Sequence, residues 1–328
     1  MNDDQNTFPE TLTEAIRYFS DPDKAFAFMK SLRWPDGNVT CAKCGCDRVS
    51  FLSTRKVWKC LDCKKQFSAK VGTIFEDSAL GYDKWFPAFW MIVNAKNGIS
   101  SCELARAIGV TQKSAWHMLH RIRLALQDGS ITKMEGNVEA DETYIGAKAR
   151  SMNAKQKAKR EAVYGHATGG VAMTAVQGLL ERGTRDKASR VKLKVLKTTK
   201  KPEVQANVKE YVLKGSEVHT DALKSYQGLE NDFVHQVVDH AVTYVKGNVH
   251  TNGLENFWCL LKRMIKGTYV CPAPFHLFRY LDEQAFRFNE RKDDDQGRFL
   301  KGIMGIVGKG LRYAKLIGEG EPNDYLPA

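Results

Sequence analysis

The stretch Cys41–Cys63, CAKCGCDRVSFLSTRKVWKCLDC, decides the fold of the first part of the chain. It contains two C-x-x-C pairs, Cys41/Cys44 and Cys60/Cys63, with fifteen residues between them. Each pair can form a tight turn that points two thiolates at one ion, and a β-hairpin between the pairs completes tetrahedral sulfur coordination, which suits Zn²⁺. The stretch therefore predicts a structural zinc ion in a zinc ribbon.

A redox role for the C-x-x-C pairs is disfavoured because two of them occur at ribbon spacing. Cys46 is interpreted as a spare thiol, although the spacing leaves open whether Cys44 or Cys46 is the ligand. The segment KKQFSAKVGT that follows the second pair can supply a third strand. Eight cysteines in a chain without an export signal also argue against a disulfide framework.

Charge is distributed unevenly along the 328 residues, whose net charge is +12. Residues 146–214 hold 17 Lys/Arg against 5 Asp/Glu, as expected of a surface that neutralises phosphates, although a solvated charged surface would look the same. The N-terminus is acidic where a signal peptide would be basic, and the apolar runs are too short to span a bilayer. We expect a cytoplasmic, nucleoid-associated protein that does not enter a membrane.

The sequence after the ribbon has a helical pattern up to Gln127. Ser101 can cap a helix over CELARAI, Gly109 permits a turn, and Thr111 can cap a second helix over QKSAWHMLHRIRLAL. This predicts a helix-turn-helix, although an ordinary helical hairpin has the same pattern. The expected DNA-facing residues of the second helix are Gln112, Lys113, Ser114, His117 and Arg121.

Short strand-like segments follow Gly136, with acidic residues at their ends. NVEADETYIG carries Asp141, two further strands and an amphipathic helix come next, and a later strand runs into Asp221. HTNGLENFWCLLKRMIKG then forms a helix, capped by Thr251 or Asn252, with Glu255 in its first turns. This order predicts an α/β fold with an RNase H-like core, a mixed sheet flanked by helices.

Three carboxylates that converge in this way can bind two Mg²⁺ or Mn²⁺ ions for in-line attack at phosphorus. Asp141, Asp221 and Glu255 are the candidates, and Lys262 lies on the same helix face as Glu255. Adjacent strand residues point to opposite faces, so Asp141 and Glu142 cannot both face the ions. The competitors for ligand roles are Glu139, Glu142 and Asp239.

The ribbon cysteines, VEADETYIG, VHTDALKSY and VHTNGLENFWCLLKRMIKGTY together resemble the zinc-ribbon DDE transposases of bacterial insertion sequences, the ISXO type. The resemblance runs from about Phe26 to about Arg291. It implies DNA strand cleavage and strand transfer at the ends of a mobile element, with Asp141 and Asp221 as the first two acids. Related groups use Glu or Asn as the third, so Glu255 is preferred and Asn252 and Asn256 stay open.

The resemblance also implies double-stranded DNA as partner, both terminal inverted repeats and target DNA. Lys262 matches the lysine that contacts DNA after the third acid, and the ribbon and helix-turn-helix are expected to bind the repeats. Lys148 and Arg150 in the basic stretch 146–160, and Arg263 beside Lys262, are further candidate phosphate contacts. Bringing two ends together implies a homodimer or higher oligomer on DNA.

The expected organisation is an acidic helical leader over 1–35, the zinc ribbon over 36–74, the helix-turn-helix module over 75–130, the catalytic domain over 135–292 and a C-terminal tail over 293–328. Two other functions remain open. One is a DNA-binding regulator derived from a transposase, and the other is an RNase H-like nuclease that cleaves without rejoining.

Overall fold

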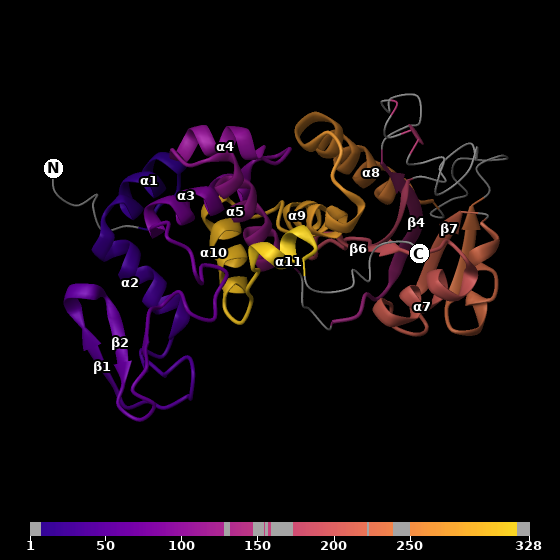
Figure 1. Cartoon of the computed structure of the whole chain (residues 1–328). Helices are drawn as coiled ribbons and strands as arrows, with labels where there is room; N and C mark the ends of the chain where they lie inside the picture. The colour runs from indigo at the N-terminus through magenta and orange to yellow at the C-terminus, as the bar shows by residue number, and fades with distance from the viewer. Residues whose placement is uncertain are drawn as a thin grey trace. The chain divides into compact units, whose positions relative to one another are not determined.

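The computed structural model describes residues 8–127, 132–146, 173–221, 223–238 and 250–319, with residues 154, 157 and 158. The chain forms two compact units (Figure 1). Unit 1 combines Met1–Gln127 with Asp293–Glu321, and unit 2 is built from Asp128–Lys292. In the part of the chain that is described, no helix has the length and apolar character needed to cross a membrane.

The zinc ribbon of unit 1 is a three-stranded antiparallel sheet in the order β1-β2-β3. Its strands are β1 (Val49–Leu52), β2 (Val57–Cys60) and the two-residue β3 (Gln66–Phe67), with a 3₁₀ turn η1 (Ser53–Arg55) between the first two. Trp58 of β2 is buried and forms the centre of an aromatic cluster, with ring centroids 4.9 Å from Trp34, 5.0 Å from Phe51 and 5.6 Å from Phe26. The ribbon therefore has a small apolar core besides its cysteines.

Helices make up the rest of unit 1, and the predicted helix pair is present. Ser100, and not the predicted Ser101, caps the first helix of the pair by accepting a hydrogen bond from the Glu103 amide at 3.1 Å. Gly109 takes φ +67° at its end, and Thr111 caps the second helix as predicted. The helices are α1 (Leu12–Ser20), α2 (Pro22–Arg33), α3 (Tyr82–Asn94), α4 (Ser101–Ile108) and α5 (Gln112–Ala125).

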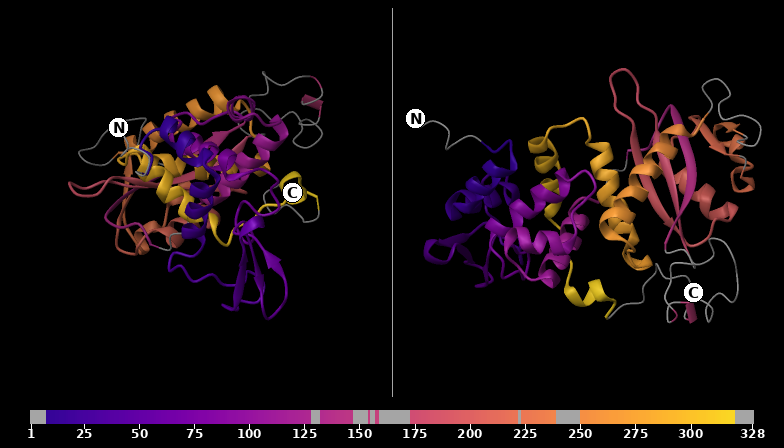
Figure 2. Two further views of the ribbon diagram at one scale, coloured as in Figure 1. Left: turned by 90° about the vertical axis from the view of Figure 1, so that its left-hand side faces the viewer. Right: turned by 90° about the horizontal axis from the view of Figure 1, so that it is seen from above.

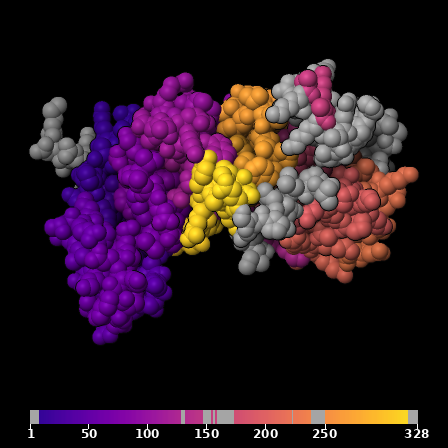
Figure 3. Space-filling model, viewed as in Figure 1, coloured from indigo at the N-terminus to yellow at the C-terminus, as the bar shows by residue number. Residues whose placement is uncertain are grey.

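The C-terminal segment, predicted as a tail, returns to unit 1 as α10 (Asp295–Ile303), the turn η7 (Met304–Ile306) and α11 (Tyr313–Ile317). These helices, yellow in Figures 1 and 3, lie against the helical part of the same unit. Phe299 of α10 is fully buried in an aromatic core. Its ring contacts Phe8, Phe19, Phe28, Phe89 and Trp90 at centroid distances of 5.0–6.2 Å. Residues from both ends of the chain thus form one core.

Unit 2 is built on a five-stranded mixed sheet in the order β6-β5-β4-β7-β8. The first three strands pair antiparallel, and β4, β7 and β8 pair in parallel. This is the RNase H-like arrangement that the sequence predicts. The strands are β4 (Asn137–Ile145), β5 (Thr174–Glu181), β6 (Arg190–Leu196), β7 (Glu217–Asp221) and β8 (Val234–Val238).

Helices cover both faces of this sheet (Figure 2). On one face, α8 and α9 pack on β5 and β6 in a core that includes Phe257, Leu261 and Leu281. On the other face, α7 packs on β4 and β7 through Val204 and Val208. The helices and turns of unit 2 are α7 (Lys201–Tyr211), η3 (Lys224–Tyr226), η4 (Leu229–Asn231), α8 (Asn252–Met264), the π-helical turn η5 (Ile265–Tyr269), η6 (Pro274–His276) and α9 (Leu277–Asn289).

Phe299→Ala tests whether the C-terminal segment is part of the core of unit 1. Emptying a fully buried phenylalanine site should lower the free energy of unfolding by about 3–5 kcal/mol. Leu300→Ala at the next position is the matched control, because Leu300 is 36% exposed and should cost under about 1 kcal/mol. Chemical denaturation of both variants measures the difference. Equal stabilities would mean that α10 does not support this core.

Candidate active site and zinc centre

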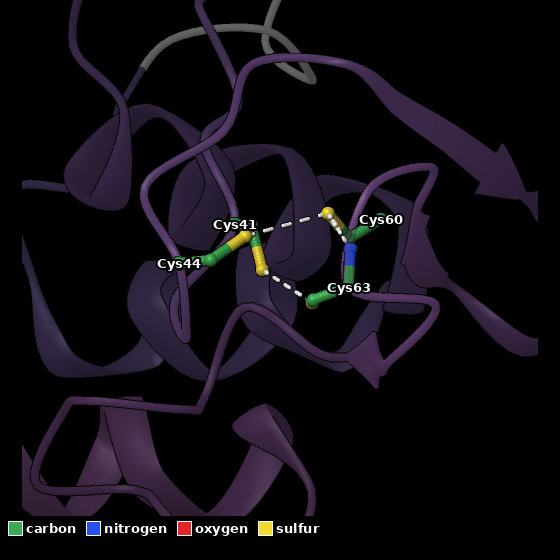
Figure 4. Close-up of side chains that lie close together, drawn as sticks. All are labelled: Cys41, Cys44, Cys60 and Cys63. Atoms are coloured by element: carbon green, nitrogen blue, oxygen red, sulfur yellow. Dashed lines mark hydrogen bonds between the residues drawn. The ribbon is translucent and has the colours of Figure 1, made fainter.

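The four predicted zinc ligands converge on one point (Figure 4). The sulfurs of Cys41 and Cys63 are 3.7 Å apart and those of Cys44 and Cys60 are 3.6 Å apart, and all four lie within 4.8 Å of one another. A tetrahedral zinc ion with Zn–S bonds of about 2.3 Å places its sulfurs about 3.8 Å apart. The donor set therefore fits a structural zinc ion. Cys46 is outside this group, so Cys44 is the ligand that the geometry favours.

Backbone amides support the thiolate form of two of these cysteines. The amide of Lys43 donates to Cys41 Sγ and the amide of Cys63 donates to Cys60 Sγ, each at 3.4 Å. The Cys63 amide is the main cause that lowers the pKa of Cys60 to about 6. Thiolates are the form that binds zinc, so the hydrogen bond from the Cys63 amide favours the form of Cys60 that binds the ion.

Asp141 lies in the middle of the sheet of unit 2, on the face covered by α8. Its partner across the sheet is Gly178 of β5, and its Oδ2 accepts a hydrogen bond of 2.8 Å from the indole Nε1 of Trp258 on α8. Burial is the main cause that raises the pKa of Asp141, and the negative charges of Asp221 and Glu255 raise it further. Asp141 is therefore within electrostatic range of the other two predicted acids.

Asp221 and Glu255 reach this site from separate elements. β7 pairs with β4 in parallel with Ala140 opposite Thr220, so Asp221 follows beside Asp141 at the end of its strand. Glu255 is exposed in the first turn of α8. The oxygens of the three acids do not all lie within the 4.8 Å that encloses the thiolates. Carboxylate oxygens are nevertheless the type of ligand that Mg²⁺ and Mn²⁺ prefer.

Gly178 makes room for the tryptophan that holds Asp141. A Cβ atom at this position would lie 2.7 Å from two ring carbons of Trp258 and 2.9 Å from a methyl carbon of Leu254. Real Cβ atoms do not approach other atoms so closely, so only glycine lets α8 lie this near to β5. Trp258 belongs to the apolar core of unit 2. It is buried, and it also has this second contact.

Two competing acids have other partners. Glu139 is 1% exposed, and its carboxylate accepts hydrogen bonds from the Leu254 amide at 2.8 Å and from Arg182 Nε at 2.7 Å. Glu142 lies on the opposite face of β4, where Tyr226 donates to it, and burial raises its pKa to about 7. Neither is placed as a metal ligand, and the third competitor, Asp239, lies outside the described residues.

Glu139 replaces the helix cap that the sequence suggests. Thr251 occupies the N-cap position of α8 but makes no side-chain capping hydrogen bond. Glu139 instead accepts from the amide of Leu254 in the first turn, where a negative charge also interacts favourably with the helix dipole. Glu139 on β4 thus caps the beginning of α8, the helix that carries Glu255. The alternation of Glu139 and Asp141 along one strand face was the signal available in the sequence.

The predicted DNA-facing residues of α5 divide into two groups. Gln112 and Lys113 are exposed at the beginning of the helix, and Ser114, which is half-buried, shares a hydrogen bond with the cap Thr111. Arg121 is only 6% exposed and donates to the backbone carbonyls of Ile74, Glu76 and Leu311. The prediction that Arg121 faces DNA is therefore corrected, because its guanidinium is held inside unit 1.

His117 is turned in the same direction as Arg121. Its Nε2 lies 3.0 Å from the Leu311 carbonyl, and burial lowers its pKa. Of the other candidates, Lys262 is half-buried and Arg263 is exposed on the last turn of α8. Lys148 and Arg150 lie outside the described residues, as does nearly all of the basic stretch 146–160.

Comparison with known proteins assigns most of unit 2 and the zinc ribbon of unit 1. Residues 133–289 match the ISXO2-like transposase domain, and residues 20–66 match the transposase zinc-ribbon domain. A protein from Halobacterium salinarum, described as an uncharacterized protein in transposable element ISH50, is 27% identical over 265 residues, which cover 76% of this chain and 85% of that protein. Asp141, Asp221 and Glu255 lie inside the first match and the four clustered cysteines inside the second. The chain belongs to the family of zinc-ribbon DDE transposases of insertion sequences, the ISXO type.

Proposed function

We propose that the protein binds the terminal inverted repeats of its insertion sequence and catalyses DNA strand cleavage and strand transfer with Asp141, Asp221 and Glu255. The single observation that supports this most is the match of residues 133–289, which contain all three acids, to the transposase domain. Because two ends must be joined, we expect at least a homodimer on DNA, acting in the cytoplasm on the nucleoid.

Two Mg²⁺ or Mn²⁺ ions bound by these acids would activate the attacking oxygen and stabilise the leaving oxygen. The protein supplies the positions of the ligands. The hydrogen bond from Trp258 to Oδ2 holds the carboxylate of Asp141 in position. Lys262 lies two helical turns beyond Glu255 on the same face, so it can contact a phosphate of the same DNA strand.

End recognition is assigned to unit 1. Gln112 and Lys113 are exposed at the beginning of α5, which supports a role for them in contacting base edges, as a helix-turn-helix would use them. Ser114 stays a candidate with them, whereas the buried Arg121 supports the packing of the helix. The zinc ribbon carries Lys43, Lys59, Lys64 and Lys65 around its cluster, all of which are exposed and can contact phosphates.

Asp141→Asn should abolish metal-dependent cleavage of labelled end DNA, with a loss on the order of a thousandfold or more, because the amide is a poor ligand for a hard cation. Binding to the ends in a gel-shift assay should persist. Asp186→Asn, on an exposed turn, is the matched control and should cleave normally. A regulator would keep its activity in Asp141→Asn, and a nuclease would cleave without joining ends in a strand-transfer assay.

Gly178→Ala tests the contact that positions Asp141. The added methyl group displaces Trp258, so we expect a loss of about 1–3 kcal/mol in stability and a fall in cleavage rate on the order of a hundredfold. Affinity for end DNA should not change. Gly310→Ala is the control, because a Cβ there meets nothing within 4 Å. A normal cleavage rate in Gly178→Ala would show that Trp258 does not position the acid.

Cys60→Ser should remove bound zinc, unfold the ribbon and lower affinity for end DNA, because the site has only four ligands. Cys46→Ser is the matched control and should retain one zinc per chain, measured by atomic absorption, with normal DNA binding. If Cys60→Ser lost its zinc but bound the ends normally, the ribbon would have no part in end recognition.

A further inference from the structure

The turn that follows α8 has an unusual backbone. Val270 has φ +63° and ψ −69°, and the amide of Cys271 donates to the carbonyl of Tyr269 at 2.8 Å. This is a γ-turn with positive φ, a conformation that is rare and strained. The β-branched side chain of Val270 increases the strain. The Val270 side chain is nevertheless 74% exposed, so burial of the side chain does not offset the strain.

Contacts on the preceding residue hold this turn in place. The hydroxyl of Tyr269 donates to Glu283 of α9 at 2.7 Å, and its ring lies 4.7 Å from that of Tyr280. Glu283 is fully buried and pairs with Arg287 on the next helical turn. A strained residue persists when its surroundings fix it in this way, and such residues concentrate at functional sites. The π-helical turn Ile265–Tyr269 that leads into it is a second feature common at such sites.

The chain around this apolar tip is basic. Residues 256–281 contain no Asp or Glu, and their Lys and Arg residues are Lys262, Arg263, Lys266 and Arg279. Arg263 and Lys266 are exposed on the turns just before Val270. An apolar side chain beside positive charges fits duplex DNA, where phosphates flank the apolar faces of bases and sugars. A second copy of the same surface would carry the same charge and be repelled.

We propose that the Val270 turn is a DNA wedge whose apolar tip inserts into the duplex and disturbs base stacking at one step. The proposal rests on the proposed function, since it concerns the DNA on which Glu255 acts. Val270 lies fifteen residues after Glu255, which is about 22 Å at the rise of a helix. A duplex that runs along α8 would meet the wedge roughly six or seven base pairs from the cleaved bond, at 3.4 Å per base pair.

The experiment uses end DNA with 2-aminopurine placed at successive positions, without Mg²⁺ so that no strand is cut. The wild-type protein should raise the fluorescence at one or two adjacent steps, roughly six or seven base pairs from the cleavage site. Val270→Thr, which keeps the shape of the side chain, and Val270→Gly should both abolish this rise and weaken binding roughly five- to tenfold. Val234→Thr on β8 is the matched control, since Val234 is 53% exposed, and should behave as wild type.

Thermal unfolding of the free protein gives a second measurement. Val270→Gly should raise the melting temperature, because glycine adopts positive φ without strain, whereas an ordinary loop residue would show no gain. The wedge proposal is wrong, and the proposed function stands, if the wild-type protein cleaves end DNA but unstacks no base. The same holds if Val270→Thr unstacks bases normally. The wedge is also wrong if Val270→Thr changes only the oligomeric state. If the wild type neither binds nor cleaves end DNA, the proposed function itself fails.

Discussion

The buried carboxylate of Glu139 makes the contact on which the arrangement of unit 2 depends. It joins the middle of β4 to the beginning of α8 through the Leu254 amide and balances its charge with Arg182. Removing one partner of such a buried group leaves the other unpaired, which costs far more than a surface ion pair. Because α8 begins at this point, the direction of the whole helix follows from it, including the positions of Glu255, Trp258 and Lys262.

The two faces of β4 carry different side chains and pack against different helices. Glu139 and Asp141 point to the α8 face, while Val138, Ala140 and Glu142 point to the α7 face. Burial is the main cause of the raised pKa of Asp141, and the like charges of Asp221 and Glu255 add to it. The close packing of Trp258 over Gly178 holds that acid in position. Buried polar groups are present on the other face as well, because Glu142 accepts a hydrogen bond from Tyr226 there and burial raises its pKa to about 7.

Features that depend on local spacing could be predicted from the sequence. The cysteine pairs, the order of the strands and the positions of Asp141, Asp221 and Glu255 follow from short motifs and from alternation along a strand. Contacts between distant residues could not be predicted in this way. Arg121 has the spacing of a DNA-facing residue, yet it donates to carbonyls as far away in sequence as Leu311. The cap provided by Glu139 and the place of Phe299 in the core of unit 1 are equally non-local.

Because α10 and α11 return to unit 1, the two units complete their folding in a fixed order during translation. Unit 2 is encoded between the two parts of unit 1, so it leaves the ribosome before Phe299 does. Unit 1 cannot complete its aromatic core until residues 128–292 of unit 2 have been synthesised. A chain that stops early can carry all three acids and still lack the completed helical unit. Unit 1 can therefore fold stably only in chains whose translation has passed through the whole catalytic domain.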